Sequence, residues 1–439
     1  MKNQHLYLLC SFFGIFAMQV RAQNFTSFFT GSESDIVTSP QGGVCMMGGA
    51  TEDDEAMKWF LNRADGGDVL VLRASGSDGY NNYFYSQLGV SVNSVETIRF
   101  NNAQASFDAY VLERIEKAEA IWFAGGDQWN YISYWRNTPV DSLINKGIAE
   151  RNIVVGGTSA GMAILGSHYF SAQNGTITSN AALQNPFNNN VTVDNTPFLQ
   201  VPYMNQVITD THYDNPDRRG RHSVFLARIL SESGIHAKGI ACDEYTALCI
   251  DENGIAKVFG GYPNYDDNAY FIQTNCESNN PNPEVLEPNQ ALTWNLNGEA
   301  LKVYAVKGTS TGANTFDLND WKTGNGGSWQ HWSINNGNFT SDEGIEPDCQ
   351  QVSINTFKEN VIQLYPNPFN DQVTIFDLPA NCETVQLFSM DGRLLTTKKI
   401  ANQNQVVLET TSLGAGTYIL LVIDKTGNQQ TKKLVKSIN

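Results

Sequence analysis

The segment 153–166, IVVGGTSAGMAILG, constrains the fold more than any other stretch of the chain. Its β-branched start is typical of a buried strand, the small residues that follow allow a tight turn, and the final residues suit a helix. Ser159 stands at the apex of this predicted strand–turn–helix unit, which matches the pattern G-x-S-x-G. A serine held in this way can meet a base, while the helix start directs N–H groups toward a developing oxyanion. The alternative interpretation is a buried turn whose serine only caps the helix.

Strands and helices alternate through the first part of the chain. The predicted strands lie at 44–49, 68–72, 95–100, 120–123 and 153–155. This alternation predicts an α/β fold with a mostly parallel sheet and helices on both faces. Ligands bind at the carboxyl ends of strands in such sheets. The turn 125–128, GGDQ, and the turn that holds Ser159 both follow such ends, so we expect them on the same rim.

A serine nucleophile needs a base and an acid that orients the base. The chain beyond residue 22 has five histidines, which are His168, His212, His222, His236 and His331. His212 is the best candidate for the base because it follows the end of a predicted strand at 206–209. Glu244 lies in a turn between predicted strands at 238–242 and 247–250 and is a good orienting acid, although Asp243 beside it competes for this role.

Composition excludes several classes of partner. The net charge is −17 and no basic stripe offsets it, which argues against nucleic acid or an anionic membrane as a partner. The first 22 residues have a polar start, an apolar middle and a small-residue end, which predicts a signal peptide removed at export. The sequence contains neither C-x-x-C nor H-E-x-x-H, so we expect no metal site, and no cofactor is predicted.

Export permits disulfide bonds between the cysteines that follow the signal peptide. Cys276 and Cys349 flank one segment and form one plausible pair, and Cys242 and Cys249 on two short predicted strands form another. Cys45 lies in a predicted core strand and is expected to remain a buried thiol.

The composition changes near residue 340, which divides the chain. We expect a first domain at 23–340, an acidic, proline-containing linker at 341–360, and a separate β module at 361–439. Alternating apolar residues and turn signals in the last segment predict about seven short strands, which is typical of a small β-sandwich.

Five motifs resemble those of the cyanophycinase-like serine peptidases, a family that includes aspartyl dipeptidases. They are GGDQ at 125–128, GTSAGM at 157–162, D-x-H at 210–212, R-G-R at 219–221 and GIACDEYTA at 239–247. The motifs occur in family order, and the resemblance covers roughly residues 40–340. It implies a three-layer αβα fold of the glutamine-amidotransferase type and a hydrolase that cleaves peptide or isopeptide bonds near acidic, aspartyl residues.

The resemblance also implies a role for each matching residue. Ser159 would be the nucleophile, His212 the base and Glu244 its orienting acid. The remaining implied residues are oxyanion donors at Gly126 and Ala160, substrate-holding groups at Gln128 and Asp210, and receptors for a substrate carboxylate at Arg219 and Arg221. The alternative for the two arginines is a solvated surface position, or ion pairs with Asp214 and Asp217.

Three departures from the family pattern separate this chain from true cyanophycinases. Thr211 stands where the family usually has glutamine, residues 215–217 are inserted, and Val224 replaces a further arginine. The implied mechanism survives these changes, but cyanophycin as the substrate does not follow from them.

The C-terminal module is similar to the sorting domains of the type IX secretion system of Bacteroidota. The residues that carry this similarity are 364–368, 390–393, 413–418 and 432–433. The similarity implies the type IX machinery as a partner and a secreted or cell-surface protein. A carbohydrate-binding or spacer sandwich is the alternative, and a homodimer is left open.

Two other functions compete with a peptidase. An α/β-hydrolase esterase shares the elbow pattern, but that fold places its acid before its histidine, so His331 would have to be the base and Asp243 or Glu244 the acid. The departures at Thr211 and Val224 leave open a non-catalytic surface binding protein built on a peptidase scaffold.

Overall fold

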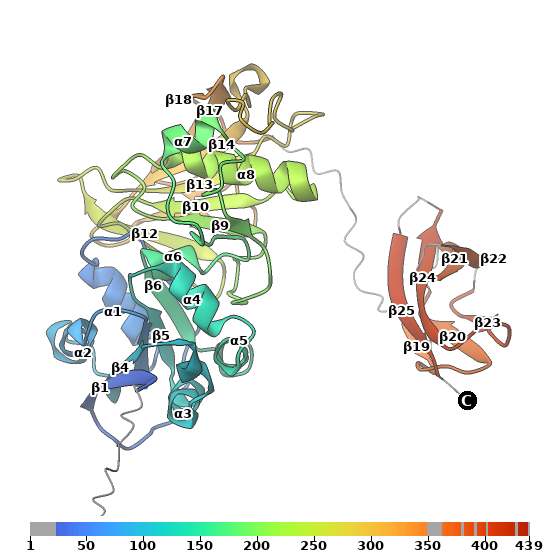
Figure 1. Cartoon of the computed structure of the whole chain (residues 1–439), viewed down its shortest axis with the longest axis horizontal. Coiled ribbons are helices and arrows are strands. Elements are labelled where there is room, and N and C mark those ends of the chain that lie inside the picture. Colours follow the sequence, from blue (N-terminus) through green and yellow to red (C-terminus); the bar gives the residue numbers. More distant parts are fainter. Residues whose placement is uncertain are drawn as a thin grey trace, which may run out of the picture. The chain divides into compact units, whose positions relative to one another are not determined.

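The computed structural model describes residues 23–348, 362–378, 382–389, 393–400, 403–425 and 429–437. The described residues do not include the predicted signal peptide, nor do they include residues 349–360, which comprise Cys349 and the last part of the predicted linker. The chain forms two compact units, Met1–Cys349 and Gln350–Asn439. Figure 1 shows both units, and each is described by itself.

The first unit is built on a central sheet whose middle strands are parallel. In order across the sheet these strands are β4 (Ser94–Phe100), β3 (Asp68–Arg73), β5 (Ala120–Phe123), β6 (Val154–Thr158) and β2 (Val44–Met47). Antiparallel strands extend it on both sides: β1 (Phe25–Gly31) beyond β4, and β11 (Ala247–Ile250), β12 (Ile255–Tyr262), β15 (Asn314–Asp317) and β16 (Gly324–Asn325) beyond β2. The predicted mostly parallel sheet is therefore confirmed.

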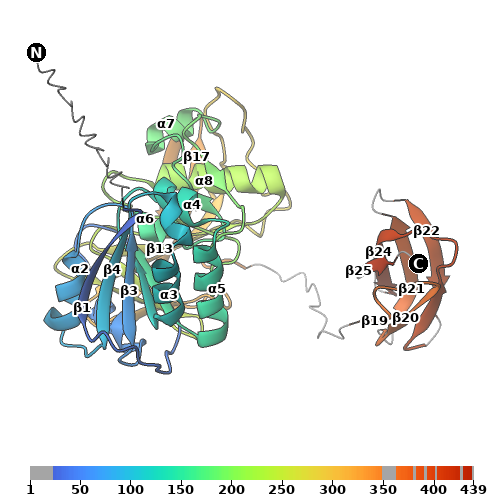
Figure 2. The same cartoon turned by 60° about the horizontal axis from the view of Figure 1, so that its bottom comes forward.

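Helices cover both faces of this sheet because neighbouring residues of each strand point to opposite sides. Leu70 and Leu72 of β3 enter the core beneath one set of helices, while Val69 and Val71 enter the core beneath the other. The first set comprises α3 (Ala109–Lys117), α4 (Gln128–Trp135), α5 (Pro139–Arg151) and the short helix α6 (Ala160–Ala163). The second set comprises α1 (Asp54–Asn62) and the helical segment in which α2 (Gly79–Asn82) is followed directly by η1 (Tyr83–Gln87). Figure 2 shows α2 on one side of the sheet and α3 and α5 on the other.

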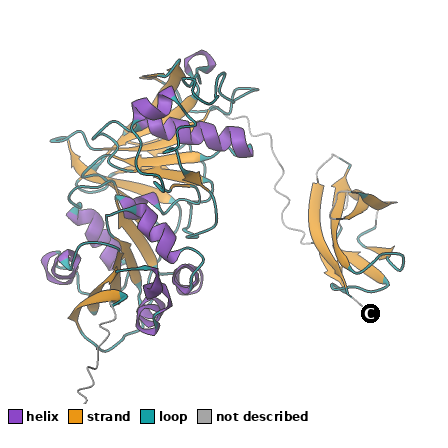
Figure 3. Cartoon of the chain, viewed as in Figure 1, coloured by secondary structure: helices purple, strands orange, loops and turns teal. Residues whose placement is uncertain are grey.

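A second sheet lies beside the first and was not predicted from the sequence. Its strands, in order, are β18 (Asn338–Glu343), β17 (Gly327–Asn335), β14 (Leu301–Lys307), β13 (Asn268–Thr274), β10 (Lys238–Cys242) and β9 (Val207–Asp210). Only the β9–β10 pair is parallel. Helices α8 (Arg219–Ser233) and α7 (Ser179–Gln184) pack against one face of this sheet. Figure 3 shows the two groups of strands and the helices around them.

The remaining short elements of this unit are connections. They are η2 (Ala103–Phe107), β7 (Tyr169–Phe170), β8 (Val193–Asp194) and η3 (Leu296–Gly298). Strands β7 and β8 pair with each other, and no helix of the described residues is long and apolar enough to cross a bilayer.

Two predictions about the first unit are wrong in detail. The expected end at residue 340 falls inside β18, whose register pairs Ser341 with Trp332 and Glu343 with Gln330, so the unit continues past that point.

Cys242 and Cys249 are free thiols because β10 and β11 belong to different sheets, and Cys249 instead lies opposite Cys45 with 3.6 Å between the sulfur atoms. Cys276 is disulfide-bonded, and its expected partner lies outside the described residues.

The second unit is a small β-sandwich, as predicted. One sheet contains β19 (Gln363–Tyr365), β20 (Gln372–Phe376) and β23 (Val406–Glu409). The other contains β22 (Leu394–Lys399), β21 (Cys382–Ser389), β24 (Gly416–Asp424) and β25 (Gln429–Lys436). Inward-facing residues such as Val373, Leu387 and Leu420 form a core of its own.

Candidate active site

Ser159 lies between β6 and α6 in a backbone conformation that residues other than glycine rarely adopt. Its φ and ψ are 52° and −115°, and its N–H donates to the carbonyl of Met47 at 3.1 Å. The turn closes because small residues surround it: a side chain at Gly161 would collide with the carbonyl of Phe123 on the neighbouring strand. Strained backbone of this kind is concentrated at functional sites. The strand–turn–helix predicted around Ser159 is therefore present, with the serine at its apex.

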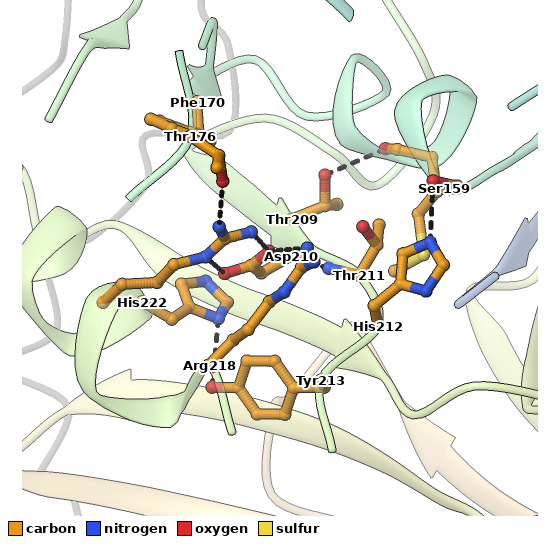
Figure 4. Close-up of polar contacts among 12 residues, drawn as sticks. Ser159, Phe170, Thr176, Thr209, Asp210, Thr211, His212, Tyr213, Arg218 and His222 are labelled. Carbon is orange, nitrogen blue, oxygen red and sulfur yellow. Dashed lines mark hydrogen bonds and ion pairs between the residues drawn. The ribbon is translucent and has the colours of Figure 1, made fainter. Parts of the chain in front are cut away.

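His212 follows the end of β9 and contacts Ser159. Its Nε2 lies 2.9 Å from Ser159 Oγ, as Figure 4 shows. The backbone of His212 has a φ of 47°, and its N–H donates to the carbonyl of Gly48 at 2.8 Å. Gly49 packs so closely on the imidazole that a side chain there would collide with the ring. The two glycines after β2 therefore fix both the backbone and the ring of His212.

Glu244 holds the other side of the imidazole. Its Oε1 lies 2.6 Å from His212 Nδ1, and its Oε2 accepts a hydrogen bond from Asn215 at 3.2 Å. The hydrogen bond with His212 lowers the pKa of Glu244, with a further contribution from Asn215. A carboxylate at Nδ1 favours the tautomer whose Nε2 accepts the proton of the Ser159 hydroxyl.

Asp243, the competing acid, faces another way. Its Oδ2 accepts hydrogen bonds from the backbone N–H and the side-chain amide of Asn268, at 3.1 and 2.9 Å. Its Oδ1 is buried without a hydrogen-bond partner among the described residues, and burial raises the pKa of Asp243 to about 7. Glu244, and not Asp243, contacts His212.

The GGDQ turn lies beside Ser159, as expected for two strand ends on one rim. A side-chain carbon placed on Gly125 would lie 3.7 Å from Ser159 Cβ. Asp127 caps α4 by accepting from the N–H of Trp129 at 2.9 Å, and this fixes the turn that contains Gly126. Gln128 begins α4 and donates from its side chain to the carbonyl of Phe170 at 3.3 Å. Ala160 is the first residue of α6.

Asp210 and Arg221, which are expected to hold the substrate, form a buried ion pair with each other. Each is about 3% exposed. Arg221 Nε donates to Asp210 Oδ2 at 2.8 Å and its Nη2 donates to Oδ1 at 2.5 Å. The Arg221 guanidinium also donates to the carbonyl of Ile177 and lies over the ring of Phe170. The pair neutralises itself inside the protein, so neither group is presented to a ligand.

Arg219 is also paired locally. Its Nε and Nη2 donate to the two carboxylate oxygens of Asp217 at 2.9 and 2.6 Å, and its guanidinium lies over the ring of Phe339. This is one of the ion pairs that the sequence offered as the alternative to substrate binding. Sequence reasoning did not consider Arg218, whose Nη1 lies 3.9 Å from Asp210 Oδ1.

The other histidines have different surroundings. His331, which an α/β-hydrolase arrangement would require as the base, lies on β17 with its Nε2 3.1 Å from Lys302 Nζ. His222 is buried in α8 against Tyr213, and burial lowers its pKa to about 4. Among the histidines of the described residues, only His212 has a hydrogen bond with Ser159. No group of acidic, histidine or cysteine side chains in this part of the chain is arranged to hold a metal ion.

Comparison with known families assigns both units. Residues 73–258 match the model of peptidase family S51, and residues 363–437 match the secretion system C-terminal sorting domain. The first of these matches covers 186 of the 439 residues. The chain is a serine-type peptidase, and its sorting domain supports secretion or location at the cell surface.

Curated proteins that are similar to this chain are named cyanophycinases. One from Geminocystis herdmanii is 28% identical over 230 residues, which cover 49% of this chain and 77% of the relative. Another, from Trichormus variabilis, is 26% identical over 168 residues, which cover 38% of this chain and half of the relative's length.

Solved structures similar to the two units are also known. A peptidase from an acI-B1 Actinobacterium is 14% identical with a TM-score of 0.40, and the match covers 53% of this chain and 91% of that protein. A protein with an immunoglobulin-like β-sandwich fold from Bacteroides vulgatus is 15% identical with a TM-score of 0.15, and the match covers 17% of this chain and 96% of that protein.

Proposed function

We propose that this S51 peptidase hydrolyses peptide or isopeptide bonds near acidic, aspartyl residues by means of a Ser159–His212–Glu244 triad. The observation that carries the proposal is the position of His212, whose two ring nitrogens lie 2.9 Å from Ser159 Oγ and 2.6 Å from Glu244 Oε1. The acidic preference is supported by the relatives, which are named cyanophycinases at 24–28% identity.

In the first half of the reaction, Ser159 Oγ attacks the scissile carbonyl carbon while His212 Nε2 takes the hydroxyl proton. Glu244 stabilises the imidazolium that forms and keeps Nε2 directed at the serine. The N–H groups of Gly126 and Ala160 are proposed to stabilise the negative oxygen of the tetrahedral intermediate, since Ala160 follows Ser159 in sequence and Gly126 lies in the GGDQ turn beside Ser159. Collapse of the intermediate breaks the C–N bond, and His212 gives its proton to the leaving amine.

In the second half, water enters and His212 takes one of its protons. The resulting hydroxide attacks the acyl carbon of the ester on Ser159, and the carboxylic acid product leaves as the Ser159 oxygen regains a proton from His212. Every proton transfer therefore passes through the same imidazole nitrogen, which the hydrogen bond to Glu244 holds in place.

A fluorophosphonate probe tests the nucleophile directly. We expect the probe to label the chain once, on the peptide that contains Ser159, and to leave Ser159→Ala unlabelled. Mass spectrometry of the digested protein locates the adduct. Absence of an adduct on Ser159 at probe concentrations that label trypsin would favour the non-catalytic binding protein, and labelling that survives in His212→Ala at the wild-type rate would refute His212 as the base.

The acidic preference requires a separate test with peptides. A library of acidic, neutral and β-linked aspartyl peptides is incubated with the chain, and the new amine ends are quantified. Faster cleavage of acidic or β-aspartyl peptides supports the proposal, and equal cleavage of all classes refutes the preference while leaving the triad intact.

The sorting domain accounts for the cellular route that we propose. The type IX machinery is the proposed partner of residues 361–439, after passage of the inner membrane with the predicted signal peptide at residues 1–22. A homodimer stays a prediction.

A further inference from the structure

We propose that Arg218 is the specificity-determining residue that binds a carboxylate of the substrate beside the triad. This inference rests on the proposed function and reassigns anion binding from Arg219 and Arg221 to a neighbouring arginine. It follows from which of the three guanidinium groups still has hydrogen-bond donors to offer.

Two of the three arginines around the start of α8 already have carboxylate partners. Arg221 uses its Nε and Nη2 on Asp210, and Arg219 uses the same two atoms on Asp217. Two parallel N–H···O bonds are the strongest arrangement between a guanidinium and a carboxylate, so a substrate would have to displace an internal partner from either residue.

Arg218 has no such arrangement. Its nearest acidic atom is Asp210 Oδ1, at 3.9 Å from Nη1, which exceeds hydrogen-bond distance. That oxygen already accepts from Thr211 N–H and Arg221 Nη2. Among the described residues, no side-chain or carbonyl oxygen accepts a hydrogen bond from the Arg218 guanidinium, whereas its backbone N–H donates to the carbonyl of Tyr213 at 2.9 Å.

Arg218 lies in a partly buried place, where guanidinium N–H groups that lack an acceptor are energetically unfavourable. Its side chain is only 20% exposed, so water reaches little of the guanidinium. Burial and the neighbouring Arg221 guanidinium both lower the pKa of Arg218. The carboxylates of Asp210, Glu244 and Asp214 act on Arg218 through their charge, but among the described residues none accepts a hydrogen bond from its guanidinium. A carboxylate that enters the site would supply those hydrogen bonds.

Arg218 also stands in the right part of the molecule. Figure 4 shows its side chain rising past Tyr213 toward Asp210 and Thr211, the two residues that precede His212. Its charge acts on Glu244, whose carboxylate contacts His212. An anion bound at Arg218 would therefore lie close to the reacting centre, and the substrate would carry that anion near the scissile bond.

Three variants of the full chain test this role. We expect Arg218→Ala to lower kcat/KM for acidic peptides by about 10- to 100-fold, mainly through KM, as for the loss of charged hydrogen bonds. Cleavage of neutral, amidated peptides should change less than about threefold. Arg218→Lys, which keeps the charge without the planar fork, should retain part of the preference. Arg219→Ala is the matched control and should leave the preference in place.

The peptides distinguish the two sources of carboxylate. One set has an acidic side chain and an amidated C-terminus, and the other has neutral side chains and a free C-terminus. A selective loss in either set supports Arg218 as the receptor and names the carboxylate. An equal loss in all peptides, no loss in any, or a selective loss in Arg219→Ala overturns the proposal.

Labelling with the fluorophosphonate separates this inference from the proposed function. Arg218→Ala should be labelled on Ser159 at a rate close to that of the wild type, because the probe carries no carboxylate. Failure of the wild type to be labelled would refute the triad itself, whereas normal labelling with unchanged peptide preference would refute only the role of Arg218.

Discussion

Backbone strain marks the residues of the proposed triad. Ser159 and His212 have φ values of 52° and 47°, and Tyr245, which follows Glu244, has 61°. Ser159, His212 and Glu244 each lie in a turn shortly after a strand, and this local pattern made them candidates in the sequence. Asp210 and Arg221 were assigned differently because their mutual ion pair depends on how α8 packs against β9, which no local pattern reveals.

Asp243 provides a prediction at the residue scale. The pKa of Asp243 is about 7 in the folded protein, whereas the ordinary value for an aspartate, taken for the unfolded chain, is 3.8. At a pH between 3.8 and 7, the unfolded chain therefore binds fewer protons at this residue than the folded protein does. The free energy of unfolding should therefore fall as the pH rises from 4 to 7, by roughly 2–4 kcal/mol for this group. Asp243→Asn, whose carbonyl oxygen can still accept from Asn268, should lack this component.

Urea unfolding at pH 5 and pH 8 measures the difference. The variant should gain stability relative to the wild type at the higher pH, whereas the exposed control Asp78→Asn should follow the wild type at both. A parallel pH dependence in the wild type and Asp243→Asn would show that Asp243 titrates normally.

At the scale of elements, the βα units of the first sheet were predictable and the second sheet was not. Apolar runs that end in turns indicate strands, but β9 and β10 have the same local pattern as strands of the first sheet. Their place in the second sheet depends on the pairing of β9 with β10 and of β10 with β13. Helix α5 was overlooked, although Thr138 caps its start and Asn152 ends it in a left-handed conformation.

Helix α6 packs closely against β5 at Gly161, and this contact leads to a testable prediction. Gly161→Ala would press a methyl group on the carbonyl of Phe123, so the elbow or the strand must shift. We expect a loss of about 1–3 kcal/mol in unfolding free energy, together with slower labelling of Ser159. Gly79→Ala in α2 is the control because no atom lies within 4 Å of its added carbon. Equal stability and labelling in the two variants would contradict this description of the elbow.

At the scale of the whole molecule, each of the two units has its own hydrophobic core. The sequence offers one local sign of a division, which is the change in composition near residue 340. The exact end of the first unit was not predictable, because the acidic residues that resemble a linker include Asp342 and Glu343 of β18. Their backbones pair with β17, and only this long-range pairing distinguishes an acidic edge strand from a linker.

Truncation tests this boundary. A fragment of residues 23–349 should fold and cleave peptides as the full chain does, since it keeps β18, the hydrogen bond from the N–H of Asp348 to Glu277, and Cys349, the expected disulfide partner of Cys276. A fragment of residues 23–340 should melt at a lower temperature because it removes half of the edge strand. Identical melting temperatures, or loss of activity in the longer fragment, would contradict the division.

The most direct test of the triad is the kinetics of Ser159→Ala, His212→Ala and the double variant on the peptide that the wild type cleaves fastest. Residues that act as one unit give non-additive losses, so each single change should lower kcat by about three to six orders of magnitude and the double change by hardly more. We expect this result together with circular dichroism spectra that match that of the wild type. Turnover of Ser159→Ala within about tenfold of the wild type, or losses that multiply in the double variant, would contradict it.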